Sequence, residues 1–169
     1  KGEYILDKII FATGFDALTG SILKLNITGK KGINLSKFWS KGPKSFLGLL
    51  VPNFPNLFIV SGPGSPSVLT NVPVQIEQHV NWITNCIKYL EKNRKKSIET
   101  TNLAAKKWQK EIMNSVKKTL FMKAKSSWYK GDNIPGKPKT FLPYPGGMPK
   151  YKNECLKVEK NKYKELKIS

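Results

Sequence analysis

Apolar and polar residues follow two different spacings along the chain, and the change falls at Pro73. Ahead of it, apolar residues come in short runs within residues 1–13 and 56–61, which is typical of strands buried in a parallel sheet. Glycine and proline interrupt residues 14–55, which favours irregular structure with small strands such as 22–27. The first part of the chain is therefore predicted to supply strands to a sheet.

Beyond Pro73 the apolar residues recur at intervals of three and four, which predicts an amphipathic helix. Its expected buried face consists of Ile76, Val80, Ile83, Ile87 and Leu90. Thr70 or Asn71 is placed to cap its N-terminus, and the cations of residues 92–96 suit its C-terminal dipole. Ser97 is expected to cap a second helix. The buried face predicted for that helix consists of Ala105, Trp108, Ile112 and Val116.

Residues 123–149 are rich in glycine and proline, which forbid a long helix or a central strand. The large aromatic residues of this stretch are Trp128, Tyr129, Phe141 and Tyr144. A long loop with this content is usually functional or packed rather than a linker. From Tyr151 a short helix is predicted, followed by an extended piece at residues 163–168.

The composition indicates one globular domain, with 169 residues of which 39% are hydrophobic and 24% charged. No apolar run approaches the roughly 18 residues of a membrane span, and no signal peptide is visible, so we expect a cytoplasmic protein. The net charge of +19 comes almost entirely from lysine, with Arg94 the only arginine. Arginine is the usual reader of bases and phosphates, and an AT-rich coding sequence also explains a lysine bias. Nucleic-acid binding is therefore the less favoured interpretation.

Few residues offer self-contained catalytic chemistry. His79 is the single histidine and is interpreted as structural, because no nucleophile and no metal-ligand set accompanies it. Cys86 and Cys155 are far apart and form no C-x-x-C pair, which disfavours a zinc ribbon or a disulfide framework. The carboxylates form no paired arrangement for acid–base catalysis. We therefore expect no metal site and no catalytic residue in this chain.

Three glycine-containing segments could nevertheless bind a ligand. Residues 12–16 follow the first predicted strand, at the end where open α/β sheets bind ligands. Residues 62–71 lead into a helix N-terminus, which favours an electron-rich group such as a phosphate or the pyrimidine edge of a flavin. Residues 127–138 combine Trp128 and Asn133 with glycine and proline, which suits a lid. Each also has a purely structural interpretation, as a turn, a helix cap or a surface loop.

In this order, the segments resemble part of the flavin-dependent Baeyer–Villiger monooxygenases, of the cyclohexanone or phenylacetone monooxygenase type. The matching segments are I-I-F-A-T-G-F-D-A at 9–17, F-P-N-L-F at 54–58, G-P-G-S-P-S-V-L-T-N at 62–71, I-E-Q-H-V at 76–80, S-W-Y at 127–129 and N-I-P-G-K-P at 133–138. The resemblance covers almost the whole chain. It implies an α/β fold, as the C-terminal third of an enzyme with two dinucleotide-binding domains, one for FAD and one for NADP.

The resemblance also implies a division of the chain and an activity. Residues 1–55 would be a strand and linker where the NADP and FAD domains join, and residues 56–122 the end of the FAD domain. Residues 123–149 would be a mobile control and substrate loop, and residues 150–169 a C-terminal tail. In such an enzyme NADPH reduces FAD, and one oxygen atom of O2 is inserted next to a ketone carbonyl to give an ester or lactone.

Site residues are implied position by position. Thr13 and Gly14 would lie near the cofactors where the two nucleotide domains join. Asn71 and Val72 would lie against the flavin edge, and the indole of Trp128 would hydrogen-bond NADP. The residues implied to line the ketone pocket are Ser67, Val68, Leu69 and Phe141.

Parts that the family needs are missing, since the chain has no G-x-G-x-x-G for FAD and none for NADP. We therefore expect a fragment that is inactive alone and whose partner is the missing N-terminal part of the same enzyme. Further expected partners are a small ketone and O2, with no nucleic acid and no stable membrane insertion. The alternatives are a related flavin monooxygenase that oxidises nitrogen or sulfur, and a lysine-rich nucleic-acid-binding protein.

Overall fold

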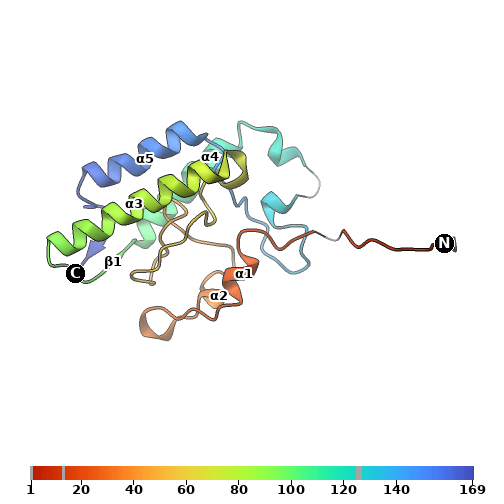
Figure 1. Cartoon of the computed structure of the whole chain (residues 1–169), viewed down its shortest axis with the longest axis horizontal. Coiled ribbons are helices and arrows are strands. Elements are labelled where there is room, and N and C mark those ends of the chain that lie inside the picture. The colour runs from red at the N-terminus through yellow and green to blue at the C-terminus, as the bar shows by residue number, and fades with distance from the viewer. Residues whose placement is uncertain (1, 13, 125–126) are drawn as a thin grey trace.

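The computed structural model describes residues 2–12, 14–124 and 127–169, and helices dominate it (Figure 1). The α-helices are α1 (Gly20–Leu23), α2 (Leu35–Phe38), α3 (Val72–Lys92), α4 (Asn102–Val116) and α5 (Met148–Lys160). Single 3-10 turns lie at Lys30–Gly32, Ser67–Leu69, Leu120–Lys123 and Trp128–Lys130. Strands β1 (Ile98–Glu99) and β2 (Lys167–Ile168) pair antiparallel, with Ile98 opposite Ile168.

Helices α3, α4 and α5 enclose the main core, in which aromatic side chains predominate. On α3, Trp82 donates from Nε1 to the carbonyl of Cys155 on α5, at 3.0 Å. The Trp82 ring meets Tyr163 edge to face, with centroids 5.5 Å apart. On α4, Trp108 stacks on Tyr144 with centroids 4.8 Å apart. Because aromatic side chains bury large areas, these contacts fix how the three helices pack.

Helix α3 is confirmed, but its buried face differs from the predicted one. Asn71 caps it by accepting a hydrogen bond from the N–H of Val74 at 3.3 Å. The buried positions of α3 are Gln75, His79, Trp82, Cys86 and Leu90. Of the predicted face, Leu90 is buried and Ile83 is half-buried, but Ile76, Val80 and Ile87 are 39%, 47% and 42% exposed. The prediction was wrong for these three because the adjacent stripe, which contains polar residues, is the one that packs.

Helix α4 has the buried face that the sequence predicts. Ala105, Trp108, Ile112 and Val116 are all buried. Its cap, however, is Thr101 rather than Ser97, because β1 intervenes between Ser97 and the helix. Thr101 accepts a hydrogen bond from the N–H of Ala104 at 3.0 Å. Ser97 instead meets the end of the chain, where its Oγ lies 2.7 Å from Oγ of Ser169.

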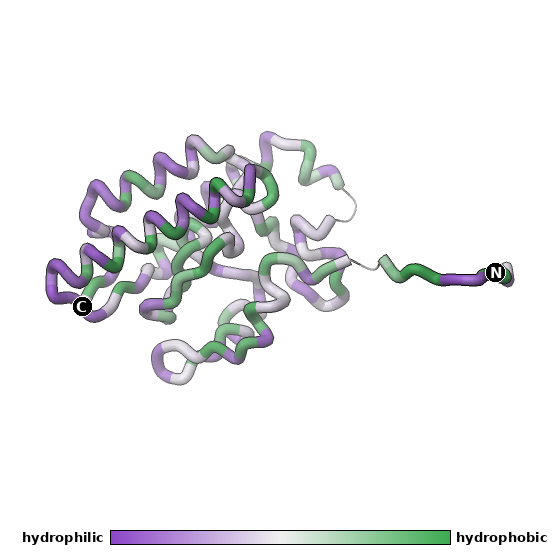
Figure 2. The backbone as a smooth tube through the Cα atoms, in the orientation of Figure 1, coloured by the Kyte–Doolittle hydropathy of each residue, from purple (hydrophilic) through white to green (hydrophobic). Residues whose placement is uncertain are grey.

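The strands expected in the first part of the chain do not form among the described residues. Residues 2–12 extend away from the body of the molecule (Figure 1), and Figure 2 shows hydrophobic residues along this piece. Residues 56–61 contribute only an isolated bridge, from Phe58 to Leu50, and residues 22–27 overlap α1 instead. A strand needs neighbouring strands to satisfy its N–H and C=O groups, and the described part of the chain offers residues 2–12 none.

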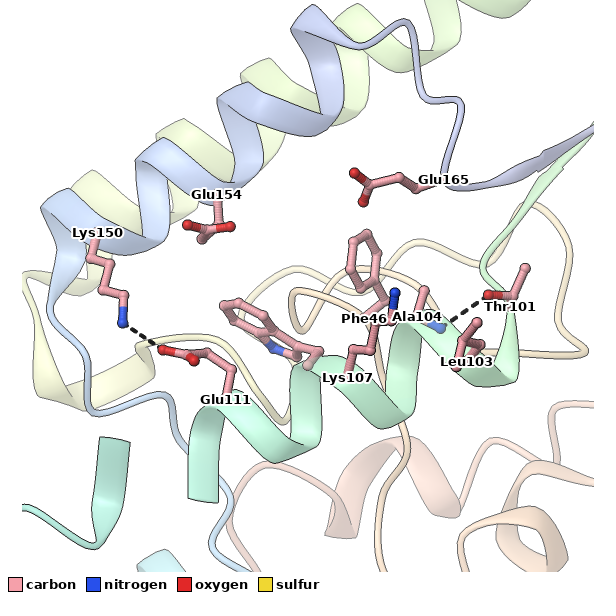
Figure 3. A pocket seen from close by; sticks show the side chains of 10 residues that line it. Phe46, Thr101, Leu103, Ala104, Lys107, Glu111, Lys150, Glu154 and Glu165 are labelled. Carbon is pink, nitrogen blue, oxygen red and sulfur yellow. Dashed lines mark hydrogen bonds and ion pairs between the residues drawn. The ribbon is translucent and has the colours of Figure 1, made fainter. Parts of the chain in front are cut away.

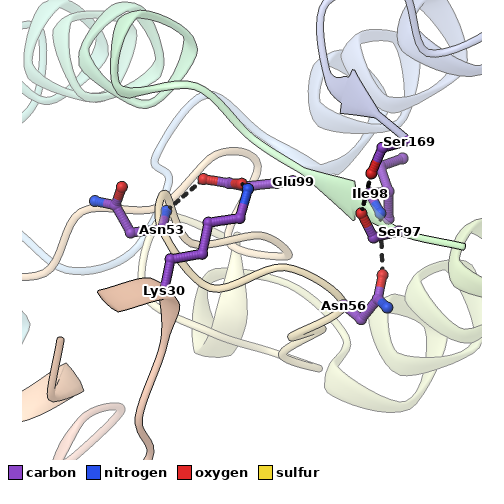
Figure 4. A network of polar contacts seen from close by, with 7 residues as sticks. All are labelled: Lys30, Asn53, Asn56, Ser97, Ile98, Glu99 and Ser169. Atoms are coloured by element: carbon purple, nitrogen blue, oxygen red, sulfur yellow. Dashed lines mark hydrogen bonds and ion pairs between the residues drawn. The ribbon is translucent and has the colours of Figure 1, made fainter. Parts of the chain in front are cut away.

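A polar network joins the first part of the chain to the strand pair (Figure 4). The buried carboxylate of Glu99 forms an ion pair with Lys30 and accepts a hydrogen bond from the N–H of Asn53 at 2.9 Å. Burial alone would raise the pKa of Glu99, but these two hydrogen bonds together with the charges of Lys30 and Lys167 outweigh it, and the pKa is lowered. Asn56 accepts from the N–H of Ile98 at 3.0 Å. These contacts, rather than the pairing of further strands, hold the first part of the chain against β1.

Helix α5 begins at Met148, ahead of the predicted start at Tyr151, and β2 lies within the extended piece predicted at 163–168. Within residues 123–149 the described structure contains no long helix, as predicted. No described helix is both long and apolar enough to span a lipid bilayer.

Candidate functional site

The turn at residues 61–67 has a backbone that its sequence and its packing both constrain. Ser61 and Ser67 have φ of 56° and 51°, and Gly64 has φ of 94°, all in the left-handed region. A neighbouring loop approaches so closely that a Cβ on Gly48 would lie 2.5 Å from the backbone nitrogen of Ser65. The strained backbone of this turn is therefore stable only as long as the residues packed against it keep it in this conformation.

Side chains from two helices hold this turn. On α4, Trp108 donates from Nε1 to the carbonyl of Gly64 at 2.9 Å. On α3, Gln75 donates from Nε2 to the hydroxyl oxygens of Ser61 and Ser65, at 3.0 and 3.2 Å. Neither role was predicted from the sequence. The available signal was that Gln75 shares a helical stripe with His79 and the buried Trp82, where a polar side chain needs a partner.

His79 also contacts the turn, from the next position of that stripe. Its Nδ1 accepts a hydrogen bond from the backbone N–H of Ser61 at 3.1 Å. Its Nε2 lies 2.7 Å from the hydroxyl oxygen of Tyr151 on α5, and that hydroxyl donates to the carbonyl of Leu47 at 2.6 Å. Burial lowers the pKa of His79 from 6.5 to about 4, so the ring is neutral at pH 7. These contacts agree with the structural interpretation of His79.

The aromatic loop at residues 127–144 is closed by its own hydrogen bonds. The N–H of Leu142 donates to the carbonyl of Tyr129 at 2.7 Å. Asp132 accepts from the N–H of Ser127 at 2.6 Å and lies 3.1 Å from Nζ of Lys130. These interactions, the Ser127 hydrogen bond first, lower the pKa of Asp132 and keep its carboxylate charged.

One end of this loop lies on the segment that follows the first predicted strand. Asn133 donates from Nδ2 to the carbonyl of Phe15 at 3.2 Å. Lys137 forms an ion pair with Asp16 and donates to the carbonyl of Ala17 at 3.2 Å. Two of the three predicted ligand-binding segments are therefore in direct contact.

The other end of the loop reaches the turn at 61–67. The N–H of Gly64 donates to the carbonyl of Leu142 at 2.6 Å. The N–H of Tyr144 donates to the carbonyl of Ser65 at 2.7 Å. Residues 127–144 thus connect segments more than 40 positions apart, and no local spacing in the sequence could have indicated this.

The residues predicted to contact cofactors lie in different settings. Thr13 lies outside the described residues. Gly14 is exposed, with φ of 83° and open space where a side chain would be. Asn71 is exposed and Val72 half-buried at the start of α3. Trp128 is half-buried, and its ring stacks on Tyr129 with centroids 4.1 Å apart.

The residues predicted to line a ketone pocket do not all face one open cavity. Ser67 is buried, Val68 is 48% exposed and Leu69 is half-buried, so this 3-10 turn presents mainly Val68 to its surroundings. Phe141 is buried in the main core, 5.5 Å from Phe121 between ring centroids. It also lines a cavity of about 340 Å³ together with Met113, Met122, Lys130, Asp132 and Lys139, among others.

A separate cavity of about 530 Å³ opens between α4 and α5 (Figure 3). Trp108 forms part of its wall. At the same cavity, Nζ of Lys150 on α5 lies 2.5 Å from Oε1 of Glu111 on α4. The hydrogen bond from Lys150 lowers the pKa of Glu111. None of the predicted site residues lines this cavity. Among the described residues, no group of three or more His, Cys, Asp or Glu side chains could hold a metal ion.

Curated proteins of known activity match this chain along almost its whole length. A cyclohexanone 1,2-monooxygenase from Acinetobacter sp is 40% identical over 99% of this chain and 31% of its own length. A Baeyer–Villiger monooxygenase from Pseudooceanicola batsensis is 38% identical over 97% of this chain and 30% of its own length. A phenazine N-monooxygenase from Lysobacter antibioticus is 38% identical over 92% of this chain and 28% of its own length.

Solved structures agree. Cyclohexanone monooxygenase from Rhodococcus sp. Phi1 bound to NADP+ superposes with a TM-score of 0.93, at 37% identity over 98% of this chain and 31% of that one. OTEMO in complex with FAD and NADP gives a TM-score of 0.90, at 33% identity over 98% of this chain and 30% of that one. The predicted fold, a part of a flavin monooxygenase, is therefore confirmed, and the match is consistent with a C-terminal part.

No protein-family model matches the chain. The chain spans about 30% of the length of the curated relatives it matches. The resemblance stated from the motifs is confirmed by these comparisons, which extend it beyond the motifs to almost every residue. The chain is therefore a homologue, along nearly its entire sequence, of a segment of the flavin-dependent Baeyer–Villiger monooxygenases.

Proposed function

We propose that this chain forms part of a monooxygenase that uses FAD and NADPH to insert one oxygen atom of O2 next to a ketone carbonyl. The product would be an ester or a lactone. The observation that carries this proposal is the loop at 127–144, which joins the segment at 14–17 to the turn at 61–67. All three predicted ligand-binding segments therefore belong to one assembly. When bound, FAD supplies the chemistry of accepting a hydride and activating O2.

The N-terminus of α3 fits an electron-rich edge of such a cofactor. Asn71 uses its side chain on the N–H of Val74, and Pro73 has no N–H to offer. Among the described contacts, the backbone N–H of Val72 has no partner. It lies at the positive end of a helix of 21 residues. Asn71 and Val72 are thus the residues of this chain that would hold the flavin edge.

The 3-10 turn after the fixed turn fits an apolar substrate. Val68 offers an exposed apolar side chain, and Leu69 a half-buried one, to the hydrocarbon part of a ketone. Ser67 is buried and would set their direction rather than bind the substrate. Phe141 packs in the core beside the 340 Å³ cavity and would form a fixed wall.

The aromatic loop at residues 127–144 would contact NADP. Trp128 stacks on Tyr129 and is only half-buried, which supports a role in which its indole N–H would donate to a ribose or amide. Gly14 leaves open space next to the contact that Lys137 makes with Asp16, which allows a cofactor backbone to approach. For Thr13, which lies outside the described residues, a role near the cofactors is proposed from the resemblance alone.

A second candidate function is oxidation of a nitrogen atom in an aromatic heterocycle. It is favoured by the similarity to the phenazine N-monooxygenase, which is nearly as close as that to the ketone-oxidising relatives. The cofactor-facing residues would be the same in both cases. Only the substrate presented to Val68 and Leu69 would differ.

The test replaces the matching segment of the Acinetobacter cyclohexanone monooxygenase with residues 1–169 of this chain. We expect the chimera to retain FAD after desalting and to oxidise NADPH with cyclohexanone, with lactone detected by mass spectrometry. A chimera that retains FAD but converts phenazine and not cyclohexanone would support the second candidate. Retained FAD with no product from either substrate would contradict both.

Two controls accompany the chimera. The chain alone should retain no FAD and should not oxidise NADPH, because it contains no G-x-G-x-x-G motif. In the chimera, Val68→Lys should raise KM for cyclohexanone without loss of bound FAD. An equal effect of Lys88→Met, at an exposed position near the C-terminal end of α3, would show that the assay does not report on the pocket.

A further inference from the structure

The hydrogen bonds around His79 permit one protonation state and one tautomer. The backbone N–H of Ser61 can only donate, so Nδ1 of His79 must be the unprotonated nitrogen. The carbonyl of Leu47 can only accept, so it takes the single proton of the Tyr151 hydroxyl. The oxygen of Tyr151 must then accept from His79, which places the ring proton on Nε2.

This chain of hydrogen bonds links three parts of the fold. It starts at Ser61, the first residue of the fixed turn, passes through His79 on α3 and Tyr151 on α5, and ends at Leu47. His79 and Tyr151 are both fully buried, at 0% exposure. No water can replace either bond without an opening of the core, because a buried polar group that loses its partner is costly.

We propose that His79, held as the neutral Nε2–H tautomer, is a positioning residue that sets the turn at 61–67 and, through it, the 3-10 turn at 67–69. This inference rests on the proposed function only where it concerns substrate. Its contact to Ser61 and those of Gln75 to Ser61 and Ser65 fix the start of the turn from α3. The bond to Tyr151 fixes the ring itself, so that the position of α5 is transmitted to the turn.

The tautomer can be measured directly on residues 1–169, since His79 is the only histidine. A long-range ¹H–¹⁵N correlation spectrum of the ¹⁵N-labelled chain at pH 7 should show one neutral form, with Nδ1 unprotonated and Nε2 protonated. A Nδ1–H tautomer, or averaging between the two tautomers, would overturn the proposal.

Two substitutions separate the two bonds of His79. His79→Asn puts an amide oxygen close to the position of Nδ1, so that the hydrogen bond from the N–H of Ser61 is kept and the hydrogen bond to Tyr151 is lost. His79→Gln reaches toward the position of Nε2, which preserves the bond to Tyr151 and loses Ser61. Both should lower the thermal midpoint, because each loses one buried hydrogen bond.

Hydrogen exchange distinguishes positioning from general stabilisation. The Ser61 amide should exchange about tenfold faster in His79→Gln than in the native chain, but close to the native rate in His79→Asn. The amide shifts of residues 62–67 should move in the Gln variant only. Equal exchange in both variants, with no selective shift at 62–67, would show a merely structural role and overturn the proposal.

A functional readout follows in the chimera. His79→Gln should raise KM for the ketone about tenfold at unchanged FAD content, and His79→Asn should restore it. The tautomer and exchange measurements need no cofactor or substrate. They can therefore fail while the proposed function holds, and an inactive chimera leaves their result unchanged.

Discussion

The indole of Trp108 donates from Nε1 to the carbonyl of Gly64 at 2.9 Å, across 44 positions of sequence. This bond ties α4 to the turn at 61–67. The same ring stacks on Tyr144, whose N–H donates to Ser65 in that turn. One aromatic side chain therefore supports the turn both by a hydrogen bond and by its packing.

Trp108→Phe should remove the hydrogen bond and keep much of the stacking. It leaves the buried carbonyl of Gly64 without this donor, so we expect a loss of about 1–3 kcal/mol in the free energy of unfolding. Urea titration measures the loss, and amide exchange at 62–67 should accelerate. The matched control is Trp82→Phe, which also removes an indole bond, but one to the carbonyl of Cys155 on α5 and not to this turn. Equal acceleration at 62–67 in both variants would contradict the assigned contact.

Substitutions in the two adjacent stripes of α3 test which one is the core. Trp82 is buried and lies outside the predicted stripe, so Trp82→Ala should cost about 3–5 kcal/mol of unfolding free energy. Ile87 belongs to the predicted stripe but is 42% exposed, so Ile87→Ala should cost clearly less, about 1 kcal/mol or below. Both are measured by urea titration of the same preparation. A larger cost for Ile87 would restore the prediction made from periodicity.

The stability of the chain should depend on pH through His79. Burial lowers its pKa in the folded state from 6.5 to about 4. Between these values the unfolded chain binds a proton that the folded chain does not, so the unfolding free energy falls as the pH drops. The loss through this window is at most about 3 kcal/mol. Unfolding curves at pH 7, 5.5 and 4.5 measure it. The decrease should be smaller in His79→Asn, and an identical decrease would assign it to other groups.

The contact of Lys137 with Asp16 should hold the aromatic loop without adding much global stability. The pair is partly exposed, so Lys137→Met should change the unfolding free energy by less than about 1 kcal/mol. Hydrogen exchange and trypsin cleavage within residues 127–138 should nevertheless rise. Lys139→Met, at an exposed neighbouring position, serves as the control. Unchanged exchange in Lys137→Met would mean that the loop is held elsewhere.

The sequence was sufficient for features that depend on neighbouring residues. Helix α4 shows the predicted buried face because its apolar residues form one stripe, with no competitor on the helix. Asn71 was one of two predicted caps for α3, because a cap acts on the next three residues. Three short segments were also enough for the resemblance, because glycine, proline and aromatic residues at fixed positions are specific.

Tertiary structure decided the rest, because the deciding partners are distant in sequence. The stripe of α3 that packs contains Gln75 and His79. Nε2 of Gln75 and both ring nitrogens of His79 find their partners on Ser61 and Tyr151. The prediction from periodicity used apolar residues alone, and it therefore favoured the stripe that contains Val80. Residues 2–12 have the composition of a strand but remain extended and exposed. A strand is completed by hydrogen bonds to another strand, and composition alone cannot supply that partner.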